Sequence, residues 1–505
     1  MSTAGSQRLV DLVGDILPVP ADVEVGDVTL DSRAVRPGAL FLACRGLTRH
    51  GLEFAPEAVA RGARAVLFDA EGAPPAALAE VKSATSGARA FAAPVAALGS
   101  HVGTIADRFF GAPSAALTVA GITGTNGKTT CAWLLAQALT ACGRPAAYAG
   151  TLGFGMPGAL RASTHTTVDA VSAHRRLGQL RALGAECVAM EVSSHALDQE
   201  RAAGVRFHTA AFTNLTRDHL DYHGSMEAYG AAKARLFAWP ALAARVVNID
   251  DPFGAELARR EAAGRLVVTT RAAQAPRGTV DYVRAARART SATGLAIDVD
   301  STWGALQIEV PLVGDFNVEN VLTVLAVLLA WDSVPAEAAS ALARATAPPG
   351  RMEAFSGGAG RPLVIVDYAH TPDALGKALQ AARAHCAGRL TVVFGCGGDR
   401  DAGKRSLMGR IAAERADRIV LTDDNPRTED PASIVAAIRA GIGSPAAVAI
   451  EHDRAAAIRS AIASSGAGDV VLIAGKGHED YQIYRATRRP FSDQDVVLAA
   501  LGRQP

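Results

Sequence analysis

Gly121-Ile-Thr-Gly-Thr-Asn-Gly-Lys-Thr-Thr130 is the segment from which the rest of the chain can be interpreted. An apolar run, residues 115–120, precedes it, and the helical pattern of residues 131–139 follows it. Strand, glycine-rich loop and helix in this order are the context that a phosphate-binding loop requires. The glycines let backbone N–H groups turn inward around phosphate oxygens, and the start of the helix adds partial positive charge. The segment therefore predicts a nucleotide-binding α/β domain.

Two side chains of this loop have an expected role. Lys128 is placed to reach the terminal phosphates, and the hydroxyl of Thr129 is placed to bind Mg²⁺. The common loop pattern has a glycine five residues before Gly127, but Ile122 occupies that position and Gly121 lies one residue earlier. This is therefore a variant of the loop. The alternative is an ordinary glycine turn with a chance Gly-Lys-Thr, which the flanking strand and helix disfavour.

Length and charge limit the kinds of protein that this chain can be. Its 505 residues suffice for about three domains. Because 51 basic residues are balanced by 50 acidic ones, we expect no general attraction to nucleic acid or to an anionic membrane. We find no secretory signal and no uncharged apolar run of the ~20 residues that a membrane helix needs. These observations predict a cytoplasmic protein.

Cysteine and lysine usage adds two further observations. The six cysteines have no paired spacing, which suits reduced thiols in a cytosolic enzyme. Only six of the 51 basic residues are lysines, and three of these, Lys128, Lys233 and Lys476, fall inside motifs discussed here. In a chain that otherwise uses arginine, a lysine can mark a position where guanidinium chemistry does not serve.

Residues 1–111 and 112–346 form the first two expected domains. The first has a strand that ends in a polar turn at residues 28–33, further strands at 39–43 and 65–68, and no evident catalytic cluster, so it is expected to bind a ligand. In the second, Glu191 ends a buried strand and is placed to hold Mg²⁺ beside the phosphate loop. Residues 270–310 are expected to form a β-rich insertion, and a long apolar helix is expected from about 317 to 331.

Residues 347–505, after a Pro-Pro-Gly linker, form the third expected domain. Four apolar runs there end in polar or glycine-bearing segments, and helical segments separate them; the runs are residues 363–366, 390–394, 418–421 and 470–474. This alternation predicts a parallel sheet, whose strand ends meet at one edge. Ligands of open α/β sheets bind at that edge. No Gly-x-Gly-x-x-Gly is present, so a dinucleotide is not expected.

Six motifs together resemble the Mur ligase family over nearly the whole chain. They are Gly121–Thr130, Glu191–His195, Thr216–Gly224, Asp367–Asp373, Asp424–Arg427 and Gly475–Glu479. The resemblance is closest to the branch that adds meso-2,6-diaminopimelate to UDP-N-acetylmuramoyl-L-alanyl-D-glutamate, an ATP-dependent ligase of peptidoglycan synthesis. It implies an α/β protein of three domains: an N-terminal UDP-binding domain (1–111), a central P-loop ATPase with a mostly parallel sheet (112–346), and a C-terminal Rossmann-like domain with a parallel sheet (347–505) that binds the amino acid.

The resemblance also implies the residues that contact UDP-muramoyl-dipeptide. In the first domain these are Leu30, Ser32, Leu47, Thr48 and Arg49; in the central domain they are His165, Thr166, Thr167, Ser193, Gln199 and Arg201. Two positions depart from the family pattern, because His165 stands where asparagine is expected and Val168 where a small residue or proline is expected.

For ATP and Mg²⁺ the resemblance implies a larger set. Nucleotide contacts are expected at Gly124, Thr125, Asn126, Gly127, Lys128, Thr129, Thr130, Asn248, Asp251, Asn317, Asn320, Arg351 and Asp367. Lys233 matches the lysine that the family carbamylates, a reaction that only a neutral amine undergoes. With Thr129, Glu191 and His219, the carbamylated lysine is expected to hold Mg²⁺. Lys128, Glu191, His219 and Lys233 are the expected catalytic residues.

In the third domain, Arg400, Asp424, Asn425, Pro426, Arg427, Gly475 and Glu479 match contacts to diaminopimelate. Diaminopimelate differs from lysine by one carboxylate, which the planar guanidinium of Arg427 can grip with two hydrogen bonds. Three alternatives stay open: a lysine-adding Mur ligase, a folylpolyglutamate synthetase, and a nucleotide switch without ligase chemistry. We expect no nucleic-acid partner, no membrane insertion and a monomer.

Overall fold

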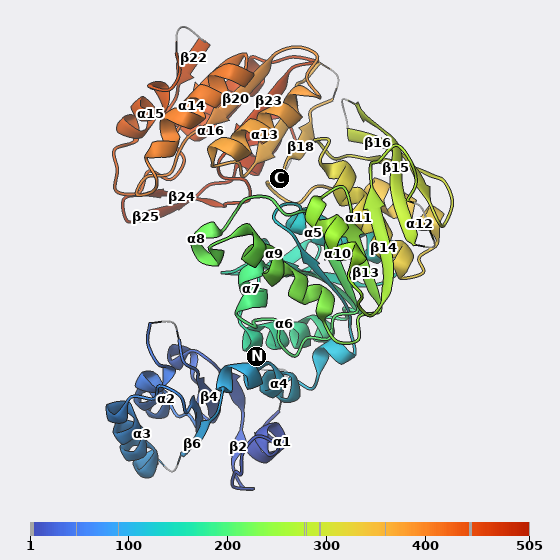
Figure 1. Cartoon of the computed structure of the whole chain (residues 1–505). Helices are drawn as coiled ribbons and strands as arrows, with labels where there is room; N and C mark the ends of the chain where they lie inside the picture. The colour runs from blue at the N-terminus through green and yellow to red at the C-terminus, as the bar shows by residue number, and fades with distance from the viewer. Residues whose placement is uncertain are drawn as a thin grey trace. The chain divides into compact units, whose positions relative to one another are not determined.

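The computed structural model describes residues 5–46, 48–88, 90–276, 278, 280–291, 294–358, 360–443 and 447–503. The chain divides into two compact units, of which the first is Met1–Lys128 with Gly143–Leu266 and the second is Thr129–Cys142 with Val267–Pro505. Each unit contains its own apolar cores. Figure 1 shows the helices and strands that the text names.

The N-terminal part of the first unit is a parallel four-stranded sheet with helices on both faces. Its strands follow the chain order: β3 Asp27–Thr29, β4 Ala39–Ala43, β5 Ala65–Asp69 and β6 Phe91–Val95. Helices α1 (Leu9–Val13) and α4 (Leu98–Phe109) cover one face, and α2 (Ala55–Ala60) and α3 (Pro75–Ala88) cover the other (Figure 1). Strands β1 (Gln7–Arg8) and β2 (Glu24–Val25) form a separate pair.

The first strand of this part ends in a polar turn, as residues 28–33 predicted. Strand β3 ends at Thr29, and the side chain of Asp31 accepts a hydrogen bond from the Arg33 N–H and starts a 3₁₀ turn at Ser32–Ala34. An aspartate in this position favours such a turn over extended backbone. Ser32 therefore lies in the turn and not in the strand.

The first unit also contains the strands around the glycine-rich loop, in the spatial order β10-β9-β8-β11-β7-β12-β13. Five of them are parallel: β7 Thr118–Thr123, β8 Ala146–Gly150, β11 Cys187–Glu191, β12 Thr209–Phe212 and β13 Ala244–Asn248. The antiparallel strands are β9 (Gly153–Met156) and β10 (Ala159–Arg161). The helices are α6 Ala170–Ala182, α7 Ser194–Asp198, α8 Leu220–His223, α9 Met226–Ala234 and α10 Pro252–Arg259.

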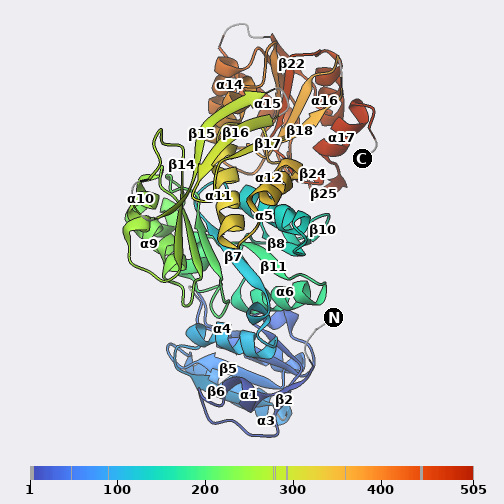
Figure 2. The ribbon, with the colours of Figure 1, turned by 90° about the vertical axis from the view of Figure 1, so that its right-hand side faces the viewer.

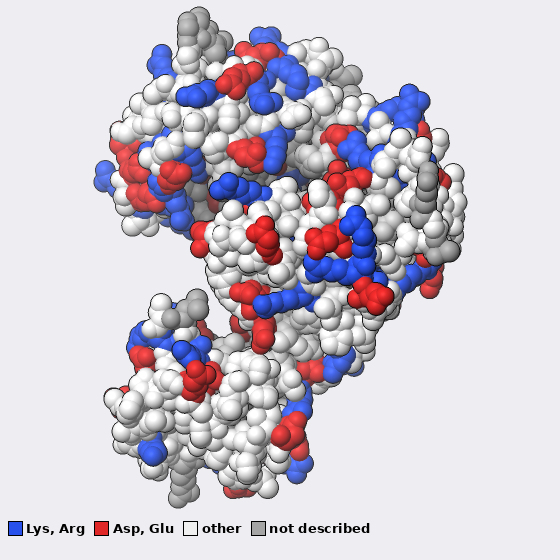
Figure 3. Space-filling view, in the orientation of Figure 1, with Lys and Arg blue, Asp and Glu red and all other residues white. Residues whose placement is uncertain are grey.

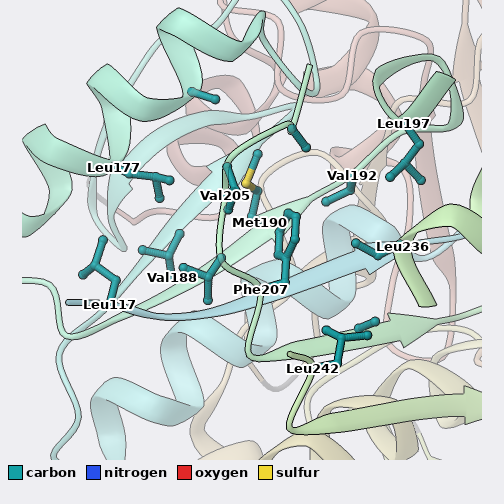
Figure 4. Packing of buried hydrophobic residues seen from close by; sticks show 14 of the residues in the cluster. Leu117, Leu177, Val188, Met190, Val192, Leu197, Val205, Phe207, Leu236 and Leu242 are labelled. Atoms are coloured by element: carbon teal, nitrogen blue, oxygen red, sulfur yellow. The ribbon is translucent and has the colours of Figure 1, made fainter. Parts of the chain in front are cut away.

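A large apolar core packs against this sheet. Figure 4 shows part of it, with Met190 of β11, Val205 and Phe207 gathered in one cluster. All five residues of β11 are buried, which is why the strand reads as a continuous apolar run and not as an alternating one. The core thus fixes the strand ends that carry the polar residues of the candidate site.

Polar contacts join strand β3 and helix α4 of the N-terminal part to helix α6 and to Arg206. Asp107 of α4 accepts two hydrogen bonds from Arg206, at 3.1 and 2.8 Å, and the buried ring of His174 lies 3.4 Å from the same carboxylate. Arg175 forms an ion pair with Asp27 at 2.8 Å. Close backbone packing accompanies these contacts, since α4 lies directly against the residues around position 203.

Gly103→Ala should reduce stability, because this packing leaves no room for a side chain. A Cβ at position 103 would lie 2.3 Å from the Ala203 carbonyl oxygen, which belongs to the backbone and cannot rotate away. We expect a loss of about 1–3 kcal/mol in the free energy of unfolding, measured by urea denaturation. Gly99→Ala in the same helix is the control, since its Cβ would meet nothing within 4 Å. Equal losses for the two variants would contradict this account.

The second unit begins with the rest of α5 (Lys128–Ala141) and resumes at β14 (Arg265–Thr270). Within it, β15 (Asp281–Ser291), β16 (Gly294–Ser301) and β17 (Leu306–Val310) form an antiparallel meander, beside which β14 runs parallel to β15. The β-rich region predicted over 270–310 is confirmed. Helices α11 (Asn317–Ala330) and α12 (Pro335–Arg344) follow, as the apolar pattern predicted for the first of them.

The C-terminal part of the second unit is a six-stranded sheet in the order β18-β19-β23-β20-β21-β22. Its strands are β18 Glu353–Ser356, β19 Leu363–Asp367, β20 Leu390–Phe394, β21 Arg418–Leu421, β22 Ala447–Ile450 and β23 Val470–Ala474, and all but β18 are parallel. The prediction of a parallel sheet from four apolar runs is confirmed, although β22 was not among those runs. A hairpin of β24 (Tyr481–Tyr484) and β25 (Thr487–Pro490) follows the sheet.

Helices cover both faces of this C-terminal sheet. One core contains α13 (Pro372–Arg383), α14 (Gly403–Arg415) and α15 (Pro431–Arg439); the other contains α16 (Arg454–Ala463) and α17 (Asp493–Ala500). Figure 2 shows α14 on one side of the sheet and α16 and α17 on the other. With both faces covered, the carboxyl ends of the strands form the edge at which polar loops can meet.

Charged side chains of both signs are interspersed on the face of the molecule that Figure 3 displays. Among the helices of the described residues, none combines the length and the apolar character needed to cross a membrane.

Candidate active site

The glycine-rich loop joins β7 to α5, as its sequence context predicted. Gly124 adopts a φ of +148°, and a Cβ there would lie 1.9 Å from the Thr213 hydroxyl oxygen, so only glycine fits. The N–H groups of Thr125 and Asn126 donate to the main-chain and side-chain oxygens of Asn214, at 2.8 and 3.0 Å. The residues that follow β12 therefore hold the loop in shape.

Two lysine ammonium groups meet at one carbonyl oxygen of this loop. The Nζ atoms of Lys128 and Lys233 lie 2.8 and 2.7 Å from the Gly124 oxygen, and Lys128 also donates to the Thr125 carbonyl at 2.8 Å. The Lys233 ammonium also lies over the ring of Tyr229. Burial and, to a lesser extent, the charge of Lys128 lower the pKa of Lys233 well below its usual value. The geometry thus favours a neutral amine at Lys233.

Glu191 is a fully buried carboxylate at the end of β11, paired in register with Ile122 of β7. It accepts hydrogen bonds from the Tyr148 hydroxyl and from the N–H and hydroxyl of Thr151, the last two at 2.9 and 3.2 Å. Donors on both oxygens fix its orientation, which is how buried carboxylates are normally satisfied. The strand pairing brings Glu191 next to the start of the glycine-rich loop.

A group of aromatic side chains lies beside Lys233. The rings of His195 and His219 are 4.8 Å apart, and Tyr222, His223 and Tyr229 extend the group. His219 has a left-handed backbone, with φ +52°, and its Nε2 lies 3.5 Å from the Asp218 carboxylate. Burial, and then the neighbouring His219 and His223, lower the pKa of His195. An imidazole that stays neutral at pH 7 is available as a ligand.

The side chains as they stand supply only some of the oxygen ligands that a Mg²⁺ site needs. Mg²⁺ prefers oxygen ligands, and the Glu191 carboxylate is one. No group of three His, Cys, Asp or Glu side chains within the described part of the chain is arranged to hold a metal ion. The Lys233 ammonium has no lone pair, whereas a carbamate on the same nitrogen would supply anionic oxygens. The residues therefore fit Mg²⁺ if Lys233 is carbamylated.

Several residues expected to contact the muramoyl-peptide are linked to each other and to Glu191. The Thr167 hydroxyl donates to the Glu191 carbonyl at 2.9 Å and accepts the N–H of Ser193 at 3.1 Å. Arg201 donates to the Gln199 side chain and to the Thr167 carbonyl, the latter at 3.2 Å. The remaining two, Thr166 and His165, bond to Thr151 and Thr164. The expected muramoyl-peptide contacts between positions 165 and 201 therefore lie close together in the first unit.

The expected uridine contacts are less tightly grouped. Leu30 lines a pocket of about 440 Å³ with Asp27, Asp169 and Arg175. The Ser32 hydroxyl is instead bonded to the Glu57 carboxylate at 2.9 Å. Arg49 pairs with Glu53, Thr48 is exposed, and Leu47 lies outside the described residues. Among the residues of this set that the structure describes, Leu30 alone lines the pocket.

The nucleotide contacts expected after residue 240 also hold the local fold together. In the first unit, the Asn248 amide donates to the Thr213 carbonyl at 2.9 Å, and Asp251 caps α10 while accepting the Leu215 N–H at 2.7 Å. In the second unit, Asn317 and Asn320 bond to each other at 2.8 Å, and the thiol of Cys131 in α5 donates to Asn320.

Arg351 and Asp367 lie close together in the second unit. The guanidinium of Arg351 lies 4.8 Å from the ring centre of Tyr368, and the Asp367 carboxylate accepts the N–H groups of Met352 and Ala369 at 2.8 and 2.9 Å. Burial raises the pKa of Asp367, against the effect of these hydrogen bonds.

At the edge of the C-terminal sheet, the residues expected to bind the amino acid come together from separate loops. The Asn425 amide donates to the Glu479 carboxylate at 2.8 Å, and the fully buried Lys476 ammonium lies 3.0 Å from the same carboxylate and 3.8 Å from Asp424. A Cβ on Gly475 would lie 2.7 Å from an Asp424 carboxylate oxygen, so glycine permits this close approach.

Arg427 adopts an unusual backbone conformation, with φ +53°, in the left-handed region that arginine rarely occupies. Its guanidinium donates to the Gly398 carbonyl at 2.7 Å, and both Arg427 and Arg400 border Gly397. The residues on either side, Pro426 and Thr428, line a pocket of about 450 Å³ together with Arg427 and residues of the β24–β25 hairpin. The guanidinium is therefore held by the loop after β20.

Sequence reasoning missed several residues of these sites. Asn214 and Tyr229 contact the glycine-rich loop, and Lys476 joins the acidic pair of the C-terminal edge. Lys476 stands inside the Gly475–Glu479 motif, so its position was a signal, and Tyr229 lies in the same helix as Lys233. Nothing in the sequence indicated Asn214, because its contacts depend on the pairing of β12 with β7.

Comparisons with known proteins agree with this architecture. Three family models match: "Mur ligase family, catalytic domain" over residues 24–109, "Mur ligase middle domain" over 122–328, and "Mur ligase, glutamate ligase domain" over 350–477. The UDP-N-acetylmuramoyl-L-alanyl-D-glutamate–2,6-diaminopimelate ligase of Ectopseudomonas mendocina is 48% identical over 482 residues, covering 95% of this chain and 96% of the relative. The ligase of the same name from Xanthomonas campestris pv. campestris is 49% identical over 497 residues, covering 98% and 97%. A solved structure of a ligase with this name has a TM-score of 0.70 at 33% identity and covers 99% of each chain.

Proposed function

The chain belongs to the Mur ligase family, and we propose that it joins meso-2,6-diaminopimelate to the γ-carboxylate of the D-glutamyl residue of UDP-N-acetylmuramoyl-L-alanyl-D-glutamate, with ATP as co-substrate. This is a step in building the peptidoglycan precursor. The relatives named for this reaction support it over nearly their full length. Within the structure, the observation that carries it is the meeting of Asp424, Asn425, Glu479 and Arg427 at one sheet edge.

A carboxylate does not condense with an amine in water, so it must first be activated. The D-glutamyl carboxylate attacks the γ-phosphate of ATP, which gives an acyl phosphate and ADP. The amine of diaminopimelate then attacks the acyl carbon, and phosphate leaves. Lys128, which lies on the carbonyls of Gly124 and Thr125 in the structure, is close enough to the loop to turn toward the transferring phosphoryl group and neutralise its charge.

Mg²⁺ and a carbamate on Lys233 belong to this proposal. When bound, Mg²⁺ neutralises charge on the phosphates and orients them for transfer. Thr129, Glu191, His219 and the carbamate of Lys233 would hold it. The chain's own contribution is a buried lysine whose pKa is lowered, which favours the neutral amine needed for addition of CO₂ more than at an exposed lysine.

The domain limits 1–111, 112–346 and 347–505 and their roles are also part of the proposal. The first domain binds the uridine end, the second ATP and the muramoyl-peptide, and the third the amino acid. The acids Asp424 and Glu479 suit the ammonium groups of diaminopimelate, while Arg400 and Arg427 suit its carboxylates. Six free cysteines and the use of ATP support the cytoplasm as the place of reaction, and a monomer suffices for this chemistry.

Phosphate release tests the reaction directly. We expect release that requires both UDP-muramoyl-dipeptide and diaminopimelate. Release with lysine at equal efficiency would instead identify a lysine-adding ligase, release with a folate acceptor would identify a folylpolyglutamate synthetase, and release that needs no amino acid would exclude a ligase.

Arg427→Ala should cost roughly 2–4 kcal/mol of transition-state binding with diaminopimelate, because it removes the guanidinium that we propose pairs with a carboxylate of that substrate. The measurement is kcat/KM for diaminopimelate and, separately, for lysine, which lacks the carboxylate in question. We expect the first to fall and the second to change little. Arg439→Ala, at the exposed end of α15, is the matched control. A parallel fall for both amino acids would argue against Arg427 as the selecting residue.

A further inference from the structure

The β24–β25 hairpin, residues 481–490, contacts the loop that carries Asp424, Asn425 and Arg427. None of its residues belongs to the motifs by which the sequence was interpreted. The hairpin nevertheless makes the hydrogen bonds that determine where this loop lies, which gives it a connection to the choice of amino acid.

The backbone of Arg427 is bound on both sides by the hairpin. Its N–H donates to the Ile483 carbonyl at 3.0 Å, its carbonyl accepts the N–H of Arg485 at 2.6 Å, and it forms a parallel bridge with Tyr484. A left-handed backbone carries a free-energy cost for arginine. These hydrogen bonds offset that cost and fix the direction in which the side chain leaves the loop.

Two further residues of the loop are held by hairpin groups. The Ile483 N–H donates to the side-chain oxygen of Asn425 at 2.9 Å, which turns the Asn425 amide toward Glu479. The buried side chain of Gln482 donates to the carbonyls of Asp423 and Asp424 at 3.3 and 3.1 Å. The hairpin thus contacts each loop residue from 423 to 425 through its main chain or side chain.

Tyr484 makes a third attachment. Its hydroxyl donates to the Asp423 carboxylate at 3.0 Å, and the other oxygen of that carboxylate lies 2.7 Å from His452 Nδ1. Burial and the charge of Asp423 raise the pKa of Tyr484, so the phenol keeps the proton that it donates. Asp423 is itself buried, and losing its partner would leave a buried charge short of a hydrogen bond.

We propose that the β24–β25 hairpin is a positioning element for amino-acid selection, in which Gln482 and Tyr484 act by holding the loop that carries Arg427. This inference rests on the proposed function, because it concerns how the third domain distinguishes diaminopimelate from lysine. Gln482 holds the main chain before Arg427, and Tyr484 holds the hairpin against Asp423. The Arg427 guanidinium is therefore fixed in position and cannot move toward a shorter substrate such as lysine.

The test is a double-mutant cycle on the full-length protein. Gln482→Met and Tyr484→Phe each remove hydrogen bonds while keeping most of the side-chain volume. We expect each to raise KM for diaminopimelate about 5- to 30-fold, since each leaves a buried acceptor unpaired, with KM for ATP and for UDP-muramoyl-dipeptide unchanged. Combined with Arg427→Ala, neither should reduce kcat/KM further, because residues that act through one group are not additive.

Controls distinguish a loss of positioning from a loss of folding and from an error in the assigned reaction. Arg488→Ala changes an exposed residue of β25, whose partner Asp480 is also exposed, and should leave all KM values unchanged. Equal changes in KM for all three substrates, or effects that add fully to that of Arg427→Ala, would overturn the proposal. If the unmutated protein prefers another amino acid, the proposed function falls, and the same cycle run with that amino acid still decides the role of the hairpin. If Gln482→Met does not fold, Tyr484→Phe alone completes the cycle.

Discussion

Lys233→Arg is expected to lower kcat about 10²- to 10³-fold, the effect typical of removing one preorganised electrostatic group from an active site. Arginine keeps the positive charge and much of the length of the side chain, but it has no neutral amine that could take up CO₂. The anionic oxygens of the carbamate would therefore be lost. Steady-state phosphate release at saturating substrates measures the effect. Lys377→Arg, in an exposed ion pair with Asp373, is the control that should keep full activity.

Two further observations decide whether the carbamate is the cause. The intact protein should carry a mass increase equal to one CO₂, absent from Lys233→Arg. Because burial lowers the pKa of Lys233, its neutral form persists to a lower pH than that of an exposed lysine. Acidification should reduce activity as the amine becomes protonated, and added bicarbonate should restore part of it. A Lys233→Arg protein that keeps kcat within a few-fold of the unmutated value would remove this part of the proposal.

Asp493→Ala is expected to destabilise the C-terminal sheet by about 3–5 kcal/mol, the cost of leaving a buried charge without its partner. Asp493 and Arg454 are both fully buried, and two hydrogen bonds of 2.7 and 2.8 Å join them. Arg454 also donates to the carbonyl of Ala474, the last residue of β23, at 3.1 Å. The pair therefore ties helices α16 and α17 to the strand that leads into Gly475.

Hydrogen exchange of the β19, β20 and β23 amides measures the free energy of opening of this sheet directly, independently of unfolding elsewhere in the chain. Asp373→Ala, which removes an exposed ion pair, should change that free energy by less than about 1 kcal/mol. Replacing both partners with apolar residues, Arg454→Met with Asp493→Leu, should recover most of the loss, because no unpaired charge then remains. An Asp493→Ala protein as stable as the Asp373→Ala control would show that the pair contributes nothing.

The sequence predicted those parts of the fold that local patterns determine. The order of strand, loop and helix around Gly124 is visible within 25 or so residues, and the buried strands β19, β20, β21 and β23 each form an apolar run that ends in a polar segment. Both are short-range signals. The polar residues after those strands could be expected to meet because parallel strands end at the same edge.

What the sequence did not predict depends on contacts between distant residues. Asn214 reaches the glycine-rich loop across 88 positions, and Tyr484 reaches Asp423 across 61. Arg454 could not be told apart from an ordinary surface arginine, since its partner Asp493 lies 39 residues away. Nor could the contacts of Lys128 with two carbonyls of its own loop be predicted, because they depend on the folded shape of that loop.

The left-handed backbone of Arg427 has a consequence for how this protein would respond to laboratory evolution. Glycine and asparagine tolerate that conformation better than arginine, so replacement would relieve local strain. A screen that selects for heat resistance alone would therefore favour such variants, which gain stability and lose the side chain that we propose selects the amino acid. Only a screen that also scores fidelity would keep Arg427.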